Sequence, residues 1–414
     1  MFAIILPLSA LFTGVAVLLL GSGLLGTLLG VRGTVEGFGD GVLGLVMSAY
    51  FLGFFLGTFM APAVIRRMGH IRAFSFYGAL FASTVLLHAI WVNPWGWGLL
   101  RVGTGLAVVG LYTVIESWLN ATADGAQRGR VFGVYMAIHL AALALGQQLL
   151  RLAPADSFAL FSLVAILVCV AMLPITATRM AQPVISPPRR LSLRHLSRIA
   201  PAAVAGALFS GLIVGTFWGL GPVYAGRLDL GMSEIAMFMS LTILGGAALQ
   251  WPIGRLSDGW DRRRTLALSC LGAAVIAAAA MAFAGSGPRL LYAIFFLYGG
   301  LTFAIYPVAV AHLLDHVDAG DLLPACATVL LLHGLGAAFG PALTGFAMAE
   351  FGPGAFPGTL MLMNLVLGSY IIARLHLRQR DTTGESHFHP MLRTSPVAME
   401  LLPETEAETG SETN

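Results

Sequence analysis

Twelve apolar segments of membrane-spanning length recur along the chain, and they restrict its fold more than any other feature. A transmembrane helix needs about 20 consecutive apolar residues. We place the segments near residues 4–30, 42–65, 73–92, 96–119, 131–152, 157–178, 202–225, 234–257, 265–285, 289–314, 323–349 and 355–376. Only 10% of the 414 residues are charged, against about 25% in soluble domains. The sequence therefore predicts an all-α membrane protein with twelve transmembrane helices.

The arginines predict the orientation of these helices. All 23 basic residues are Arg, and 18 of them lie in the loops after the second, fourth, sixth and eighth segments or after the last segment. Loops rich in basic residues stay on the cytoplasmic side of a membrane. We therefore expect both termini in the cytoplasm, and we expect the chain in the inner (plasma) membrane of a bacterium.

One polar segment divides the twelve helices into six and six. Residues 179–200 contain three Pro and five Arg, which is typical of a loop in water. We expect a six-helix bundle at 1–178, a cytoplasmic linker at 179–200 and a second six-helix bundle at 201–376. The remaining residues, 377–414, are polar and rich in Glu, so we expect a disordered cytoplasmic tail.

The two halves also repeat in sequence. The loop Arg67 to Arg72 corresponds to Gly259 to Arg264 at an offset of 192 residues, and an offset of 194 carries His139 onto His333. Internal repeats of this kind are typical of transporters, whose solute sites lie where the repeats meet, near the middle of the bilayer. The repeat therefore indicates transport.

Other classes of function find no support in the composition. The absence of Lys excludes a Walker A loop and a Schiff-base enzyme, and there is no soluble basic face for a nucleic acid. The three Cys lie far apart in apolar segments without a Cys-x-x-Cys motif, which argues against a metal or redox site. We expect no enzyme activity, no cofactor, no metal, no nucleic-acid partner and a monomer in the lipid bilayer.

Short motifs carry a resemblance to a known family over about 370 residues. The motifs are Arg101-x-x-x-Gly105, Val114-Ile-Glu-Ser117, Arg128-Gly-Arg130, Gly146-Gln147, Gln250-Trp-Pro-Ile-Gly254-Arg255-Leu-Ser-Asp258 and Tyr306-Pro-Val-Ala309. With them the chain resembles the major facilitator superfamily, and within it the YcaD-type branch of bacterial transporters. The resemblance implies two pseudo-symmetric six-helix bundles that expose a central site to each side in turn. Gly146-Gln147 stands where drug-exporting proton antiporters carry Gly-Pro, which argues against that activity.

Two residues of the fourth segment are candidates for proton coupling. Arg101 matches the superfamily's Arg motif, which the resemblance associates with proton coupling; alternatively it extends to the nearby membrane surface. Glu116 is an acidic residue within an apolar segment, where a charge is costly and usually functional. Glu116 either titrates a proton or forms a gate ion pair with Arg128 or Arg130, and its position near the end of the helix favours the gate.

The loop after the eighth segment is a candidate latch. The resemblance implies that Asp258, together with Gly254 and Arg255, packs against a neighbouring helix N-terminus and an Arg, supplied here by Arg262 or Arg263. A carboxylate is stabilised at a helix N-terminus. The alternative is that these arginines serve topology alone. A nearby sequence, His312-x-x-Asp315-His316, has the spacing of metal ligands, but we expect it to be a solvated helix end.

Polar and aromatic residues within the apolar segments are candidates for the wall of a central cavity. They are Tyr112, His139, Gln147, Trp218, Gln250, Tyr306 and His333. Histidines titrate near neutral pH and relay protons, whereas a lone His in an apolar helix more often packs and accepts a hydrogen bond. The Gln and aromatic side chains equally suit bridges between helices or anchors at the interface.

These observations predict a secondary transporter that moves a small organic or amphipathic solute by alternating access, coupled to a proton or other ion gradient. The alternatives are an uncoupled facilitator and a facilitator-like membrane protein that acts as a sensor or assembly factor without transport. A membrane enzyme would need clustered catalytic side chains at one depth, which we do not find.

Overall fold

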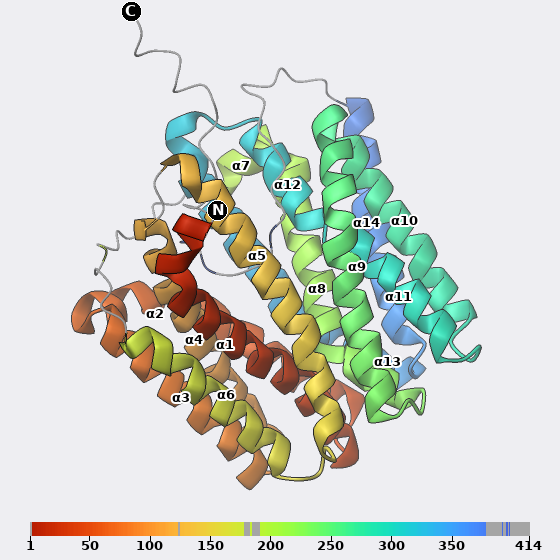
Figure 1. Ribbon diagram of the computed structural model, residues 1–414. Helices are drawn as coiled ribbons and strands as arrows, with labels where there is room; N and C mark the ends of the chain where they lie inside the picture. Colours follow the sequence, from red (N-terminus) through yellow and green to blue (C-terminus); the bar gives the residue numbers. More distant parts are fainter. Residues whose placement is uncertain are drawn as a thin grey trace, which may run out of the picture.

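The computed structural model describes residues 2–122, 125–177, 183, 191–377, 391, 395 and 397. Its helices, seen in Figure 1, are α1 (Phe2–Val35), α2 (Asp40–Met68), α3 (His70–Ile90), α4 (Pro94–Thr122), α5 (Gly125–Gln148), α6 (Ala159–Ala177), α7 (Leu193–Ile199), α8 (Pro201–Arg227), α9 (Met232–Gly259), α10 (Arg262–Ala282), α11 (Pro288–Thr302), α12 (Ile305–Leu314), α13 (Leu322–Phe351) and α14 (Ala355–Leu377). Two short 3₁₀ turns follow α5 and precede α13. Within the described residues, twelve spans are long and apolar enough to cross a membrane. The predicted all-α fold with twelve spans is confirmed.

The tenth span is broken near Pro307, a position where the sequence suggests an interrupted helix. It consists of α11 and α12, with the break at Phe303 and Ala304. Pro307 has no N–H, so it cannot donate the helical hydrogen bond to the carbonyl of Phe303 four residues earlier. The Gln250 side chain on α9 donates to that carbonyl instead, at 3.0 Å. Such replacement bonds allow Pro to stand within a membrane helix.

The helices of each half pack mainly on one another. In the first half α2 lies along α4, and α1 lies along α5 and α6; in the second half α13 lies along α8, α9 along α11 and α10 along α14. Close approach depends on small residues. A Cβ atom on Gly340 of α13 would lie 2.2 Å from the carbonyl oxygen of Leu212 on α8, so any larger residue there would separate these two helices.

Two contacts between the halves are equivalent under the repeat. α2 packs against α13, and α5 packs against α9. An offset of 194 residues places α2 on α9 and α5 on α13, so each contact is the repeat mate of the other. The halves therefore meet about a pseudo-symmetric axis, as Figure 1 shows, with α5 and α8 facing the other half.

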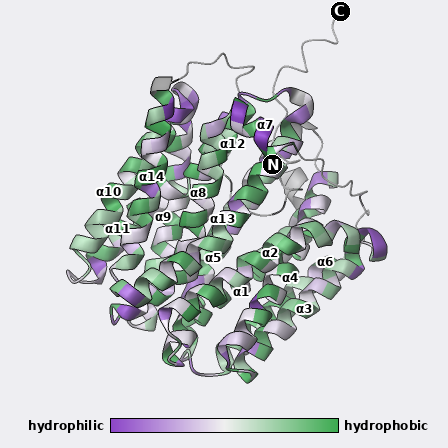
Figure 2. Cartoon of the chain, turned by 180° about the vertical axis from the view of Figure 1, so that it is seen from behind, coloured by the Kyte–Doolittle hydropathy of each residue, from purple (hydrophilic) through white to green (hydrophobic). Residues whose placement is uncertain are grey.

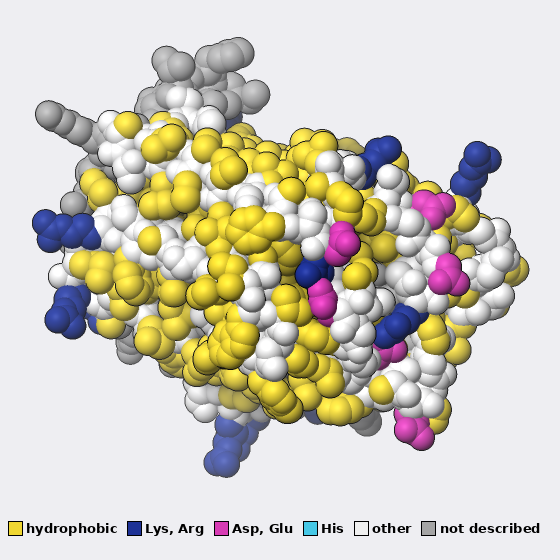
Figure 3. Space-filling model, turned by 90° about the horizontal axis from the view of Figure 1, so that it is seen from below, with side chains coloured by type: hydrophobic (Ala, Val, Ile, Leu, Met, Phe, Trp, Pro, Cys, Tyr) yellow, Lys and Arg dark blue, Asp and Glu magenta, His cyan; other side chains and the backbone are white. Residues whose placement is uncertain are grey.

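The surface divides into an apolar belt and polar ends. Figure 2 shows hydrophobic residues along the lengths of the helices and hydrophilic ones gathered near their ends. Large apolar side chains such as Leu173 and Val275 are more than 60% exposed, which is typical of lipid-facing positions. Seen from the end away from α7, the face is mostly apolar with scattered acidic and basic side chains (Figure 3).

The predicted linker contains a short helix. α7 lies within the expected 179–200 loop, and its Leu196 is fully buried. The rest of that loop lies outside the described residues except Pro183, Leu191, Ser192 and Ala200. The expected disordered tail at 377–414 also lies outside the described residues except Leu377, Met391, Ser395 and Val397.

Candidate functional site

The two ends of the bundle differ, and we name them for reference. The basic end holds Gly69, Asp261 and α7; the closed end holds the connections from α1 to α2 and from α8 to α9. At the closed end the halves are joined by polar contacts. Arg227 on α8 donates from Nε and Nη2 to Asp40 on α2, at 2.9 and 2.7 Å. Gln148 on α5 donates to Ser240 on α9 at 2.6 Å. We call these the closing contacts.

A cavity of about 140 Å³ lies between the two halves. Its wall is formed by α1, α2, α3, α4 and α5 from the first half and by α8 and α13 from the second. The lining residues are Ser22, Gly23, Leu25, Gly26, Tyr50, Phe51, Phe54, Phe81, Arg101, Thr104, Tyr112, His139, Leu143, Val214, Trp218, His333 and Ala337. Five residues selected from the sequence are therefore brought together around one cavity, although they come from four helices.

Arg101 supplies a positive charge to the cavity, and no Asp or Glu of the described residues belongs to the lining. The side chain is 5% exposed and does not reach the outer surface. Its guanidinium lies over the ring of Tyr50, 4.4 Å from the centroid, and Nη2 lies 3.8 Å from the sulfur of Met47. A Cβ atom on Gly105 would lie 2.0 Å from the carbonyl oxygen of Tyr50, so the glycine one turn later lets α4 approach α2 closely. The spacing of Arg101 and Gly105 thus places the charge over Tyr50.

His139 connects the cavity to a second polar layer. Its ring lies 5.5 Å from that of Tyr112 and 5.8 Å from that of Tyr135, measured between centroids. Its Nδ1 is buried without a hydrogen-bond partner among the described residues. One turn nearer the basic end, the Tyr135 hydroxyl donates to Glu116 at 2.9 Å. The polar layers at Tyr112–His139 and at Glu116–Tyr135 are therefore stacked one helical turn apart on α4 and α5.

His333 lines the opposite wall in a different environment. Its Nδ1 is 2.8 Å from the hydroxyl oxygen of Ser210 on α8. Its ring lies 4.6 Å from that of Tyr306. Trp218 lies in the same half and stacks on Phe303 at the break in the tenth span, with ring centroids 6.4 Å apart. The second half thus presents a histidine that is already hydrogen-bonded.

Three predicted cavity residues lie outside this lining. Gln147 is fully buried and hydrogen-bonded to Thr27 and to the Gly23 carbonyl on α1. Gln250 holds the broken tenth span, as described above, and Tyr306 packs behind His333. These contacts match the alternative of bridges between helices. A buried polar group needs a partner, and backbone carbonyls accept from the amide nitrogens of Gln147 and Gln250.

Glu116 is fully buried near the basic end of α4. Besides Tyr135, the backbone N–H of Ser395 donates to it at 3.0 Å, and the Ser395 hydroxyl also donates to it. Arg128 is partly exposed and Arg130 is exposed on the first turns of α5. The contact with Ser395 joins residues 279 positions apart, and no local pattern in the sequence indicates it. The expected gate pair with Arg128 or Arg130 stays a prediction.

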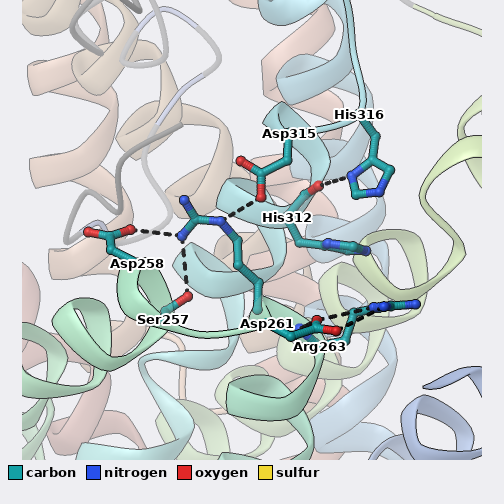
Figure 4. Close-up of polar contacts among 8 residues, drawn as sticks. Ser257, Asp258, Asp261, Arg263, His312, Asp315 and His316 are labelled. Atoms are coloured by element: carbon teal, nitrogen blue, oxygen red, sulfur yellow. Dashed lines mark hydrogen bonds and ion pairs between the residues drawn. The ribbon is translucent and has the colours of Figure 1, made fainter. Parts of the chain in front are cut away.

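The predicted latch forms a polar network at the basic end, in which Asp258 is exposed (Figure 4). Arg262 begins α10 and donates to Asp258 at 2.9 Å and to Asp315 at 2.6 Å. Arg262 and Asp315 are each 7% exposed. Asp315 was overlooked as a partner, and the expectation of a solvated end at His312 and Asp315 is wrong, because both side chains are buried. The sequence indicates this pairing only indirectly: an Asp ends the tenth apolar segment, and an Arg-rich loop follows the eighth.

The other latch residues have separate contacts. Gly254 is buried, whereas Arg255 is exposed and lies over the Trp251 ring at 3.6 Å from its centroid. Arg263 pairs with Asp261 at 2.8 Å. Burial raises the pKa of Asp261, but hydrogen bonds from the side chain and backbone of Arg263 outweigh it, so the pKa is lowered overall. Among the described residues no cluster of three or more His, Cys, Asp or Glu is suited to hold a metal ion.

The family description "Major Facilitator Superfamily" matches residues 11–322 and 203–402. An uncharacterized MFS-type transporter YcaD of Escherichia fergusonii is 26% identical over 385 residues, which cover 92% of this chain and 98% of that protein. An uncharacterized MFS-type transporter of Enterobacter sp. strain 638 is 27% identical, over 83% of this chain and 90% of its own length.

Solved structures share the fold. The nucleoside transporter NupG superposes with a TM-score of 0.75 at 15% identity, over 89% of this chain and 99% of the other. A bacterial homolog of the human lysosomal transporter Spinster, solved in an inward-facing conformation, superposes with a TM-score of 0.70 at 13% identity, over 89% and 95%. The resemblance inferred from the motifs is confirmed, and the chain belongs to the major facilitator superfamily, with similarity to its YcaD-type members.

Proposed function

We propose that the protein is a secondary transporter that works by alternating access, with the central cavity as its solute site. The observation that carries this proposal is a cavity walled by both halves, while the closing contacts join the halves at one end only of the described structure. The distribution of Arg supports a cytoplasmic basic end. The conformation is then closed to the outside, and transport requires the closing contacts to break.

The cavity favours a small organic anion with an aromatic or apolar part. Arg101 is a buried cation whose described contacts are a ring and a sulfur atom rather than a carboxylate. A buried charge is costly unless it is paired, and a carboxylate or sulfonate on the solute would pair it. Tyr50, Tyr112 and Trp218 supply aromatic surface beside that charge. Such a site holds an amphipathic solute by one charge-assisted contact and several apolar ones.

A proton route supports coupling to a proton gradient. His139 faces the cavity, and Tyr135 lies between His139 and Glu116, to which it donates a hydrogen bond. Histidine and carboxylate side chains are the usual proton carriers within membrane spans. In this scheme a proton taken up at His139 leaves through Glu116 at the basic end. In the same scheme Arg101 binds the solute, and a proton on His139 adds a second positive charge to the cavity.

The test uses purified protein in liposomes that contain a pH-sensitive dye. A panel of organic anions, cations and neutral solutes is added, and solute-dependent proton movement is recorded for wild type and for Glu116→Gln. We expect an anion to move protons, and we expect Glu116→Gln to lose gradient-driven accumulation but to keep solute exchange. Normal accumulation by Glu116→Gln would exclude this route. Downhill flux without any pH signal would favour the uncoupled facilitator, and no flux of any solute would favour a role without transport.

A further inference from the structure

A second cavity lies apart from the central one, at the basic end of the second half. It measures about 240 Å³ and is enclosed by α7, the first turn of α8 and the ends of α10, α12 and α14. Its polar lining is Ser197, Arg198, Arg263, His312, His316 and Arg374. Among the residues that the structure describes, no acidic side chain is part of that lining. Three guanidinium groups and two imidazoles thus surround one space.

The fold holds several of these groups in fixed positions. Arg374 donates from Nε to the Tyr370 hydroxyl at 3.1 Å and lies over the same ring, 5.4 Å from its centroid. The ring of His316 is oriented by the carbonyl of His312, 2.9 Å from Nδ1, and Figure 4 shows the two histidines on successive turns. With Nδ1 donating to that carbonyl, the Nε2 of His316 is left for another contact. These side chains are positioned before any ligand arrives, which lowers the entropy cost of binding.

The charge of the cavity is positive. Asp261 neutralises Arg263 through contacts of 2.8 and 3.1 Å. Arg198 is exposed at the end of α7, and Arg374 is half-buried at the end of α14. The guanidinium groups in the lining are hydrogen-bond donors without acceptor atoms, so an anion is the natural occupant.

We propose that this cavity binds a phosphate group. Arg recognises phosphate through paired N–H donors, and the Ser197 hydroxyl adds a neutral donor. The cavity lies where the ends of α8, α10 and α14 leave the apolar belt, which is the level of lipid headgroups; basic pockets between helix ends bind anionic lipids there. The phosphate therefore comes either from an anionic phospholipid or from a soluble phosphate compound.

Binding would link the linker to the latch. Arg198 belongs to α7 of the linker, whereas Arg263 follows Arg262 of the latch directly and His312 precedes Asp315 by one turn. A phosphate held by these groups would tie α7 to the second half beside the network of Arg262, Asp258 and Asp315. The site would stabilise the present conformation of the basic end.

The experiment compares three probes on detergent-purified, delipidated protein: phosphatidylglycerol, phosphatidylcholine and inorganic phosphate. The test variant is Arg198→Gln with Arg374→Gln, and the matched control is Arg72→Gln with Arg264→Gln. The control removes two exposed arginines at the same end that do not line the cavity. Binding is read by native mass spectrometry and by the shift in unfolding temperature.

We expect wild type and control to bind phosphatidylglycerol or inorganic phosphate at least about tenfold more tightly than the test variant, a loss that corresponds to removal of charge-assisted hydrogen bonds. Binding of the lipid alone would identify a headgroup site, and binding of both probes would identify a general phosphate site. Two results would overturn the proposal. One is equal binding by the test variant and wild type; the other is an equal loss in the control, because net charge would then explain the effect.

Discussion

The two halves place a histidine at the same repeat position, but the two histidines have different surroundings. His333 is bonded to Ser210 and packed on Tyr306. His139 has a buried Nδ1 without a partner among the described residues, and its neighbour Tyr135 leads to Glu116. The equivalent positions therefore line the same cavity, but their hydrogen bonding differs. The first half holds the polar groups that could carry a proton, whereas the histidine of the second half is already hydrogen-bonded.

The helix connections show the reverse difference. In the second half, Asp261 caps α10 and Arg262 joins Asp258 to Asp315. An offset of 192 residues places Gly69 on Asp261, and Gly69 precedes α3 with φ of 81° and no side-chain cap. An internal repeat preserves helix packing because both halves need it, while polar groups diverge where each half has its own task. In this account the first half recognises the solute and couples its movement to protons. The second half provides the latch network of Arg262, Asp258 and Asp315.

Replacing each histidine separately is the strongest test of this difference between the two halves. We expect His139→Gln to reduce solute-driven proton flux about 100-fold, because a positioned proton carrier contributes about 10²–10⁴ in rate. His333→Gln should leave proton flux within about threefold of wild type, since Gln can keep a hydrogen bond to Ser210. The dye-loaded liposomes provide the measurement. Equal losses in the two variants would remove the distinction between the halves.

The closing contacts offer a second test. Reversing one charge, as in Asp40→Arg, should favour the state open at the closed end by about fivefold, because partly exposed ion pairs contribute about 1 kcal/mol. A reporter Gly26→Cys lines the cavity and has open space for a side chain; it is placed in a Cys169→Ser background. Its labelling by an impermeant maleimide should accelerate in Asp40→Arg.

The charge-swapped pair controls this experiment. Asp40→Arg combined with Arg227→Asp should return the labelling rate toward that of wild type, because the ion pair is restored in reverse. Acceleration that persists in the swapped pair would mean that local packing, and not the pair, closes this end.

Replacing Gln250 tests whether this side chain stabilises the helices of the second half or binds the solute. Gln250→Ala leaves the Phe303 carbonyl without its donor, and an unsatisfied buried group costs about 1–3 kcal/mol. We expect a lower unfolding temperature with unchanged solute affinity. Pro307→Ala restores a backbone N–H that can reach the same carbonyl, so the double variant should recover part of the loss. A change in solute affinity with normal stability would return Gln250 to the solute site.

The smallest expected effect concerns the cap of α10. Asp261→Ala should cost about 1 kcal/mol of stability, as loss of an N-cap does. The pKa of Asp261 is lowered in the folded protein, so its contribution is complete above the ordinary carboxylate pKa, about 4, and disappears as the pH falls through the lowered pKa. The difference in unfolding temperature between wild type and variant should therefore shrink below about pH 4. A constant difference would mean that the charge contributes nothing.

The sequence predicted the twelve spans and five of the seventeen residues that line the cavity. His139 and His333 were selected because polar residues in apolar helices at repeat-related positions converge on the axis between the halves, whereas Tyr112 and Trp218 were selected as aromatic residues within apolar spans. The sequence analysis assigned Gln250 to the cavity wall, but its side chain donates to a carbonyl that Pro307 leaves without a backbone donor. Pro307 lies 57 residues later, and helix periodicity does not connect the two positions.

Contacts between distant segments were missed for a related reason. The pair Asp40–Arg227 joins residues 187 positions apart, and Glu116–Ser395 joins residues 279 apart. Each residue is unremarkable at its own position: Asp40 reads as a helix start and Ser395 as part of a polar tail. Such contacts depend on how whole helices pack, and the spacing of neighbouring residues in the sequence does not predict that packing.

Recognition of an anion by Arg101 is the central claim, and one measurement tests it directly. Uptake of an aromatic carboxylate and of its neutral amide is measured in proteoliposomes with wild type and Arg101→Gln. We expect wild type to prefer the carboxylate and Arg101→Gln to lose about 100-fold of that preference, because a buried charge pair contributes about 2–5 kcal/mol. Uptake of the amide should not change. An undiminished preference for the carboxylate in Arg101→Gln, or an equal loss for both solutes, would contradict the account.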